Sequence, residues 1–313
     1  MKVTKIPDLK PTDLRILPTE QPLPASRNLD QLSALEIARL INKEDATVAA
    51  AVEKALPQIA RAIDEVAAAL RRGGRLIYVG AGTSGRLGAL DASEIQPTFN
   101  TPSGAVQFLM AGGPRALGAS TEASEDDSAL ALREMKKRKP GKNDVVVGIA
   151  SSGRTPFTLA ALAYARSRGT RTIALTCNRR SPLERAAHFA IVTGVGPEVV
   201  AGSSRMKAAT AHKMVLNMIS TGAMCRLGYV YGNLMVNVWT KNDKLRARAI
   251  RILEEATGAD HAAAAKALEA SGNRTPVALV MLATGVSCSQ AAAALKKTKG
   301  NVRQAITLAG SRR

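Results

Sequence analysis

Aromatic side chains are scarce in this sequence, at 3% of 313 residues, and this weighs against one large class of function. Proteins that bind single-stranded nucleic acid stack its bases on aromatic faces. The net charge of +19 would attract nucleic acid. With so few stacking partners, however, we expect no specific nucleic-acid partner. Solvated helix faces and an anionic small-molecule substrate explain the basic excess better.

Cysteine and histidine are also few, with three of each. The cysteines, Cys177, Cys225 and Cys288, are far apart and odd in number, so they form neither a disulfide framework nor a metal-binding spacing. The histidines are equally scattered. We therefore expect no metal and no other cofactor, and we expect the thiols to be buried in a cytoplasmic protein.

Long apolar runs are missing as well. No segment approaches the roughly 18 apolar residues of a membrane span, and the N-terminal M-K-V-T-K-I-P-D-L-K-P lacks the apolar core of a secretory signal. Hydrophobic residues make up 46% and charged residues 22%, which is ordinary for a folded protein. We expect a cytoplasmic protein that does not bind membranes, with one large domain or two smaller ones.

The most informative stretch runs from Arg75 to Glu94, R-L-I-Y-V-G-A-G-T-S-G-R-L-G-A-L-D-A-S-E. Its apolar start, Leu76 to Val79, predicts a buried parallel strand, and the spacing after Arg86 predicts a helix. The glycines between them predict an irregular turn in which the backbone can approach a ligand closely. Unpaired N–H groups and the helix dipole favour an anion at such a turn. We expect a phosphate there, bound by Gly82, Thr83 and Ser84.

Two nucleotide-binding motifs do not fit this stretch. The pattern G-x-G-x-x-G matches Gly80, Gly82 and Gly85, but a dinucleotide site also requires an acidic residue at a second strand end about 20 residues later, and that fit is poor. The loop G-x-x-x-x-G-K-[ST] does not occur. Hydroxyl groups in the turn suit a small phosphate ester better than a dinucleotide. The alternative is a tight turn that binds nothing.

The centre of the chain alternates between strand and helix patterns. We expect strands at 75–79, 105–110, 144–149, 171–176 and 189–193, and helices at 86–93, 114–119, 124–138, 156–168, 181–187 and 204–226. A proline-rich arm, extended or poorly ordered, and three helices precede them, and only helices follow, at 244–256, 260–270, 275–284, 288–296 and 300–308. This order predicts an α/β fold, a doubly wound, mainly parallel sheet with N-terminal helices and a small C-terminal all-helical domain.

Two further turns are similar to the first. G-I-A-S-S-G-R-T-P follows a second apolar strand and offers Ser151, Ser152 and Thr155. A-G-S-S-R-M-K-A opens a long helix and offers Ser203, Ser204 and Lys207. In such sheets ligands bind at the carboxyl ends of the strands. Each turn is therefore an anion-site candidate, and its cations are either ligand contacts or solvated side chains.

Carboxylates are the remaining candidates for acid and base. Glu94 lies in D-A-S-E, at the end of the helix that begins at the first turn, with Asp91 on the preceding turn. A second group, T-E-A-S-E-D-D, contains Glu125, and Ser124 with Asp127 there also fits a helix cap. A carboxylate pair near a bound sugar phosphate can act as general acid and base. Spacing alone does not single out Glu94 and Glu125.

Four motifs stand in order and at fitting intervals: G-A-G-T-S-G-R-L-G-x-L-D-A-S-E, G-I-A-x-S-G-R-T-P, G-S-S-R-M-K-A-x-T-A and Y-G-N-L-M-V-N-V. With these motifs the chain closely resembles the N-acetylmuramic acid 6-phosphate etherases, a family built on a sugar isomerase (SIS) domain. The resemblance extends from about Thr19 to near the C-terminus. It implies domains at 1–55 (arm and helices), 56–240 (SIS domain) and 241–313 (a UBA-like helical domain).

The resemblance implies a cytoplasmic homodimer without metal that takes part in peptidoglycan recycling. Such an enzyme cleaves the lactyl ether at C3 of N-acetylmuramate 6-phosphate, giving N-acetylglucosamine 6-phosphate and D-lactate. It implies Glu94 as proton donor and Glu125 as base, although E-A-S-E-D stands here for the family's E-G-A-E-D. Its phosphate pocket maps onto Thr83, Ser84, Ser152 and Thr155. His212 is expected to be a surface or packed residue rather than to reach a neighbouring subunit.

Overall fold

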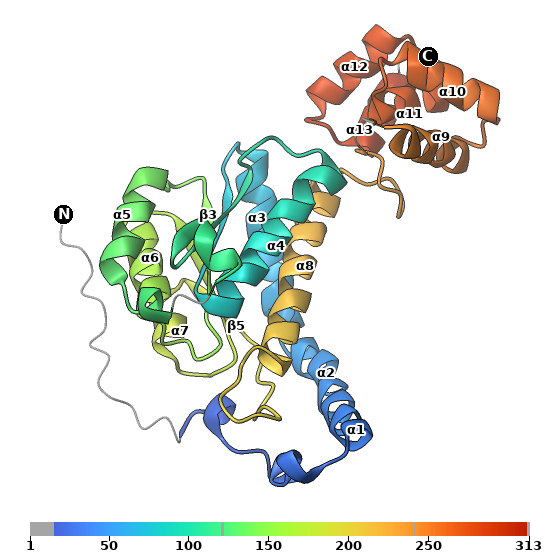
Figure 1. Cartoon of the computed structure of the whole chain (residues 1–313). Coiled ribbons are helices and arrows are strands. Elements are labelled where there is room, and N and C mark those ends of the chain that lie inside the picture. Colours follow the sequence, from blue (N-terminus) through green and yellow to red (C-terminus); the bar gives the residue numbers. More distant parts are fainter. Residues whose placement is uncertain (1–15, 120–121, 239, 241, 312–313) are drawn as a thin grey trace. The chain divides into compact units, whose positions relative to one another are not determined.

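The computed structural model describes residues 16–119, 122–238, 240 and 242–311 (Figure 1). Its contacts divide the chain into two compact units. The first consists of Met1–Ala92 and Gly104–Ser220, and the second of Ser93–Ser103 and Thr221–Arg313. The domain boundaries expected after residues 55 and 240 remain predictions.

A parallel sheet forms the centre of the first unit. Its strands, in the spatial order β2-β1-β3-β4-β5, are all parallel to their neighbours. Every residue of β1 and β3 is buried, which requires apolar side chains on both faces and explains why these strands are continuous apolar runs. The strands are β1 (Leu76–Gly80), β2 (Val106–Met110), β3 (Val145–Ile149), β4 (Arg171–Thr176) and β5 (Phe189–Val192).

Helices cover both faces of this sheet, as the predicted doubly wound fold requires (Figure 1). One layer contains α5 (Ser128–Arg138), α6 (Pro156–Ser167) and α7 (Pro182–Ala186). The other contains α3 (Leu56–Arg71), α4 (Gly82–Phe99) and the start of α8 (Lys207–Leu227). The bounds predicted from the sequence agree with the observed bounds of these helices to within a few residues. The exception is α4, which begins earlier and ends later than the expected 86–93.

The connection from β2 to α5 is less helical than expected. In place of helices at 114–119 and from 124 onward, it contains two short 3-10 segments, η5 (Gly113–Leu117) and η6 (Glu122–Glu125). Helix α5 then begins at Ser128, because Asp127 caps it by accepting a hydrogen bond from Leu130 N at 2.7 Å. The cap that the sequence allowed for Asp127 is thus confirmed.

From Ile16 onward the amino-terminal segment is packed in short turns, so the expected extended or poorly ordered arm was wrong for this part, and residues 1–15 of that arm lie outside the described residues. Leu17 is 8% exposed and Thr19 is 1% exposed, because each packs against the first unit. Short 3-10 turns follow and lead to α1 (Ala34–Asp45), which begins with a capping box between Ser33 and Glu36. The turns are η2 (Pro18–Glu20), η3 (Pro24–Ser26) and η4 (Leu29–Gln31), and α2 (Val48–Glu53) comes after α1.

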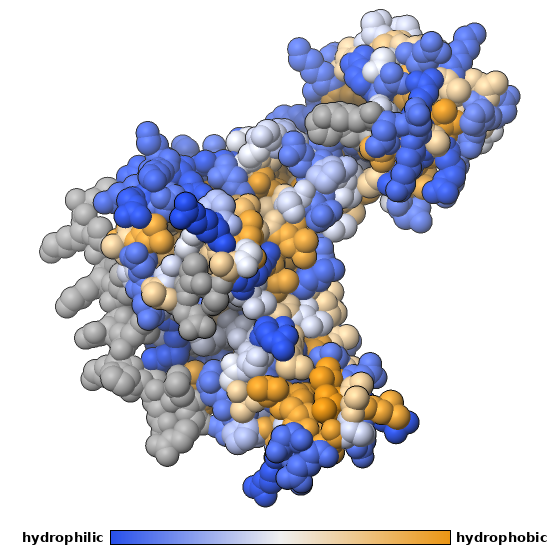
Figure 2. Space-filling view, viewed as in Figure 1, coloured by the Kyte–Doolittle hydropathy of each residue, from blue (hydrophilic) through white to orange (hydrophobic). Residues whose placement is uncertain are grey.

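Helix α1 has an apolar face with no buried residue. Leu35 at its start is 58% exposed, and Leu56 at the start of α3 is 44% exposed. Figure 2 shows apolar residues gathered over α1 and α2 at the lower right of the view. An apolar surface of this kind is typical of a contact with another molecule.

The second unit is helical from α9 onward, as the sequence predicted. Side-chain caps at Asn242, Asp260, Ser287 and Asn301 start four of its helices. Their apolar faces enclose a core of its own, around Leu253, Leu268 and Leu279. The helices are α9 (Asp243–Thr257), α10 (His261–Ala270), α11 (Thr275–Thr284), α12 (Cys288–Lys297) and α13 (Val302–Gly310).

Within the described part of the chain, no single helix is long and apolar enough to cross a membrane. Helices α11 and α12 reach that length and composition only as a pair, which is bent by 111°. The cysteines differ in burial. Cys177 is buried, but Cys288 is half-buried and Cys225 is exposed, so the expectation of buried thiols was wrong for Cys225.

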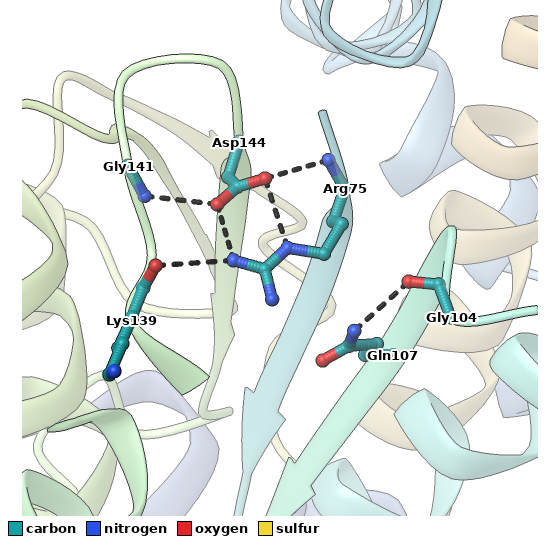
Figure 3. Close-up of polar contacts among 6 residues, drawn as sticks. All are labelled: Arg75, Gly104, Gln107, Lys139, Gly141 and Asp144. Atoms are coloured by element: carbon teal, nitrogen blue, oxygen red, sulfur yellow. Dashed lines mark hydrogen bonds and ion pairs between the residues drawn. The ribbon is translucent and has the colours of Figure 1, made fainter. Parts of the chain in front are cut away.

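An ion pair links the amino-terminal ends of the two central strands, β1 and β3 (Figure 3). Asp144, just before β3, accepts hydrogen bonds from Arg75 N at 2.8 Å and from Arg75 Nη2 at 2.7 Å, and from Gly141 N at 2.9 Å. Burial alone would raise the pKa of Asp144, but these donors outweigh burial and hold the pKa below its ordinary value. The pair joins the starts of β1 and β3 and leaves their carboxyl ends free for a site.

Candidate active site

The strand order reverses between β1 and β3, because β1 leads to β2 on one side and β3 to β4 on the other. Gly80, the last residue of β1, lies opposite Ile149, the last residue of β3. The two hydroxyl-rich turns that follow these strands are therefore neighbours. In open α/β sheets, ligands bind in the crevice at this reversal.

The β1–α4 turn is tighter than the sequence indicated. Helix α4 begins at Gly82, so the expected irregular segment from Gly80 to Gly85 is mostly the first helical turn. A Cβ on Gly80 would lie 2.8 Å from Gly85 N, and a Cβ on Gly85 would lie 2.7 Å from Met110 Cγ. Only glycine therefore fits at both positions.

The first turn of α4 has the features expected of an anion site. Its leading N–H groups have no acceptor within the helix, and the dipole of an 18-residue helix adds partial positive charge there. Thr83 and Ser84 lie in this turn, half-buried. Gly82 precedes them with a φ of +50°, which a side chain rarely adopts. Backbone and hydroxyl donors thus converge where the sequence placed a phosphate.

Glu125 is the carboxylate that the fold brings to this turn. A Cβ built on Gly82 would lie 2.8 Å from Glu125 Oε1, so the carboxylate packs directly on the Gly82 backbone. Glu125 comes from η6, in the irregular β2–α5 connection, and is half-buried. Gly82 and Glu125, which the sequence named for different roles, therefore lie together.

Arg86 ties the same connection to α4, a contact that the sequence analysis missed. Its Nε donates to Leu117 O at 3.2 Å and its Nη2 donates to Ala119 O at 3.0 Å. One guanidinium near the start of α4 thus holds two backbone carbonyls, one at the end of η5 and one just after it. The only sequence signal was the position of Arg86 next to the glycine turn.

The β3–α6 turn supplies a second set of hydroxyl groups. Ser152 Oγ accepts a hydrogen bond from Arg154 N at 3.2 Å, and Thr155 occupies the cap position of α6 without a side-chain capping bond. Gly153 has a φ of +67°, and a Cβ there would collide with Ser181. Pro156 takes the first helical position, as predicted.

Asn178 fixes the backbone of this turn from β4. Its Nδ2 donates to Ser151 O at 2.8 Å and to Thr19 Oγ1 at 3.0 Å. Asn178 is 1% exposed and Ser151 is 9% exposed. The amide therefore links three separate segments, the N-terminal segment included, behind the predicted phosphate-binding hydroxyls.

The third predicted anion site, at the start of α8, is filled by a carboxylate of the protein itself. The first amides of α8 donate to a buried carboxylate of the chain itself, because Lys207 N and Ala208 N lie 3.0 and 2.9 Å from the Glu198 oxygens. The Lys207 ammonium pairs with Glu44 at 2.6 Å. This helix start is thus not an open anion site. The roles of Ser203, Ser204 and Lys207 in substrate binding remain predictions.

A buried carboxylate holds the middle of α4. Asp91 accepts hydrogen bonds from Tyr78 Oη at 2.8 Å and from Ser220 Oγ at 2.9 Å, which come from β1 and α8. Burial raises the pKa of Asp91 to about 6, although these donors and the charge of Lys213 oppose the rise. Helix α4 packs closely on β1 at Gly88, where an added Cβ would lie 2.9 Å from Tyr78 Cβ.

Glu94 lies further along α4 than Asp91, and its side chain is exposed. It belongs to the segment Ser93–Ser103 of the second unit. Its carbonyl accepts a hydrogen bond from Thr98 Oγ1 at 2.7 Å, next to Pro97, which stands inside the helix. Proline lacks the N–H of the helical ladder. The role of Glu94 as proton donor remains a prediction.

His212 is packed, which is one of the two positions expected for it. It is fully buried on α8, with Nε2 3.5 Å from Cys177 Sγ. Burial lowers the pKa of His212 to about 4 and raises the pKa of Cys177 to about 12. A neutral imidazole and a protonated thiol are packing groups at neutral pH.

Two domain families match the part of the chain that carries this site. The glucokinase regulatory protein N-terminal SIS domain matches residues 58–166, and the SIS domain matches residues 120–222. The fold and these matches define a SIS-domain protein.

The relatives narrow the class further. The chain is 55% identical to the N-acetylmuramic acid 6-phosphate etherase of Symbiobacterium thermophilum over 275 residues, which cover 88% of this chain and 91% of the relative. It is 50% identical to that of Streptomyces coelicolor over 303 residues, covering 97% of each chain. It is 47% identical to N-acetylmuramic acid 6-phosphate etherase 1 of Bacillus licheniformis over 292 residues, covering 93% and 96%. The chain belongs to the N-acetylmuramic acid 6-phosphate etherase family.

Proposed function

We propose that this protein cleaves the D-lactyl ether of N-acetylmuramate 6-phosphate, giving N-acetylglucosamine 6-phosphate and D-lactate. The observation that carries the proposal is the 47–55% identity to etherases over nearly the whole chain. The enzyme is a carbon–oxygen lyase that acts by elimination followed by hydration. Its product is an amino sugar phosphate of the kind that peptidoglycan recycling returns to metabolism.

The phosphate occupies the junction of the β1–α4 and β3–α6 turns. The leading amides of α4, with Thr83 and Ser84, supply donors from one side, and Ser152 and Thr155 supply hydroxyls from the other. Phosphate binding is remote from the ether bond, so its energy serves to orient the reacting carbons. The support for this placement is the register that sets Gly80 opposite Ile149.

Two glutamates carry out the proton transfers. In the open-chain sugar the C1 aldehyde acidifies the C2 proton, which Glu125 removes. The C3–O bond breaks, and Glu94 protonates the departing lactate oxygen. Water then adds to C3 of the unsaturated aldehyde and C2 regains a proton, so the net reaction consumes one water. The position of Glu125 against Gly82, at the strand ends where the sugar phosphate binds, supports its assignment as the base.

The activity is tested by adding N-acetylmuramate 6-phosphate and measuring D-lactate. Lactate release is expected from the wild-type protein. A protein that only sensed sugar phosphates would bind this compound and leave it intact. An aldose–ketose isomerase would convert the sugar without releasing lactate. Either of those results contradicts the proposal.

The assignment of the glutamates is tested with Glu94→Gln and Glu125→Gln, with solvent deuterium entry at C2 measured beside lactate release. Loss of a general acid or base lowers the rate by about 10²–10⁴-fold. Glu125→Gln should lose both signals, whereas Glu94→Gln should lose lactate release and keep C2 exchange. Asp126→Asn, an exposed neighbour of Glu125, is the matched control. Near-wild-type rates in both glutamine variants would show that the assignment is wrong.

We also infer that the enzyme works as a homodimer in the cytoplasm. The unburied apolar face of α1, with Leu35 58% exposed, supports a contact between two copies. A substrate that arises from intracellular phosphorylated amino sugars supports the location.

A further inference from the structure

The segment Leu17–Glu20 lies over the carboxyl ends of β3 and β4, and the proposed function has not used it. Thr19 is 1% exposed, and its hydroxyl accepts a hydrogen bond from Asn178 Nδ2 at 3.0 Å. The same Nδ2 donates to Ser151 O at 2.8 Å. A single buried amide thus connects this segment to the turn that carries the predicted phosphate-binding hydroxyls.

This anchoring fixes the next side chain. Glu20 follows Thr19 directly and ends η2, whose first residue, Pro18, has a restricted φ. Glu20 N donates to Leu17 O at 2.9 Å, which closes the turn. With Leu17 and Thr19 both packed inward, the direction of the half-buried Glu20 side chain is set by the turn.

The Glu20 carboxylate meets the loop that precedes α8. A Cβ built on Gly202 would lie 3.0 Å from Glu20 Oε2, so the carboxylate packs on the backbone next to Ser203 and Ser204. Gly202 has a φ of +77°, which suits only glycine. Among the described residues, the Glu20 carboxylate forms no hydrogen bond and no ion pair with any side chain.

We propose that Glu20 accepts hydrogen bonds from the sugar portion of the substrate, as a specificity-determining residue. This rests on the proposed function, because it concerns the sugar phosphate bound at the same strand ends. An ionised carboxylate can accept hydrogen bonds but has no proton to donate. It would repel a phosphoryl group, so it must face the other end of the ligand, where hydroxyl groups and the acetamido N–H are the donors.

The chemistry of the surrounding loops divides accordingly. Donors gather at the first turn of α4 and in the β3–α6 turn, which suits the phosphate. Glu20, in the amino-terminal segment, supplies hydrogen-bond acceptors. A bound sugar phosphate would thus be oriented by opposite hydrogen-bonding character at its two ends, which fixes which carbon faces the glutamates.

The experiment compares two ligands by calorimetry, N-acetylglucosamine 6-phosphate and inorganic phosphate. Hydrogen bonds to charged groups contribute about 1.5–3 kcal/mol, so Glu20→Ala should weaken N-acetylglucosamine 6-phosphate by about 10- to 100-fold. Glu20→Gln, which keeps a neutral acceptor, should lose less. Inorganic phosphate should bind both variants as it binds the wild type, or more tightly.

Three controls separate this role from a structural one. Glu53→Gln, an exposed carboxylate on α2, should leave both affinities unchanged. Thr19→Val removes the hydrogen bond to Asn178 but keeps the Glu20 carboxylate. Its affinity for N-acetylglucosamine 6-phosphate should therefore lie between the affinities of the wild type and of Glu20→Ala. Urea unfolding of Glu20→Gln should match the wild type, since the substitution preserves shape.

Equal binding of N-acetylglucosamine 6-phosphate by Glu20→Ala and the wild type would overturn the proposal. So would an equal loss for inorganic phosphate, because Glu20 would then support the phosphate site. Failure of this proposal can be told apart from failure of the proposed function. Even if the wild-type protein released no lactate, the two affinities would still show whether Glu20 contacts the sugar.

Discussion

At the scale of single residues, the ionisable groups that matter are those whose surroundings differ most from water. Asp91 and His212 are both buried, and burial moves their pKa values in opposite directions. Asp91 has three hydrogen-bond donors around it, from Tyr78, Asn217 and Ser220. It fastens α4 to β1 and α8 on the turn before Glu94, so its charge state affects the element that carries the proposed acid.

Asp91→Asn is predicted to change how stability depends on pH. The folded-state pKa of about 6 lies above the unfolded value of 3.8, so the folded state releases this proton less readily, and stability is lost as pH rises through that window. The loss should reach about 3 kcal/mol, from 1.36 kcal/mol for each pKa unit. The unfolding free energy of the variant, minus that of the wild type, should therefore rise between pH 4 and pH 7 in urea titrations. A constant difference would contradict the assignment.

At the scale of elements, the β2–α5 connection is the part that most needs support. It carries Glu125, and the regular structure among its described residues is limited to short 3-10 turns, which have few hydrogen bonds of their own. Contacts from regular elements compensate for this. Arg86 on α4 bonds the carbonyls of Leu117 and Ala119, and Glu125 packs on Gly82. Helix α4 thus orients the connection that delivers the proposed base.

Arg86→Gln is predicted to loosen this connection without unfolding the protein. The loss of two charged hydrogen bonds should speed amide hydrogen exchange in residues 117–119 and 122–125 by about tenfold or more. The turnover number should fall more than the affinity for substrate, because the base is misplaced while the phosphate turns are intact. Arg86→Lys keeps the charge but cannot bond both carbonyls in the same planar geometry, so it should give only partial recovery. Unchanged exchange in Arg86→Gln would mean that other contacts hold the segment.

At the scale of the whole molecule, the first unit has an apolar surface that its other described residues do not bury. Helix α1 has a well-formed cap and an apolar face, yet none of its residues is buried. Glu44 at its end pairs with the buried Lys207, which ties α1 to the start of α8. The helix is thus held in place with its apolar side chains exposed, as a surface for a second copy would be.

Leu35→Glu is predicted to shift the protein from dimer to monomer in light scattering across a dilution series. The substitution places a charge in the proposed contact, where desolvation is costly. Lys136→Glu changes an exposed charge on α5, away from α1, and should leave the mass unchanged. A wild-type protein that is monomeric at all concentrations would contradict the inferred homodimer.

The sequence by itself determined the layers, the strand ends and the family. Apolar runs, glycines and hydroxyl groups follow one another locally in the β1–α4 and β3–α6 turns, and local patterns report on local backbone structure. Even there, the predicted bounds of α4 were wrong, because the helix begins at Gly82 inside the glycine-rich turn and continues past Pro97 to Phe99.

Only the tertiary structure decided which distant groups meet. Thr19 and Asn178 are 159 residues apart, and no periodicity relates them. Glu125 reaches Gly82 through an irregular connection, and Glu198 occupies the α8 amides that the sequence assigned to a phosphate. Each of these contacts depends on how packed elements orient side chains across the sheet edge, which is a property of the assembled core rather than of neighbouring residues.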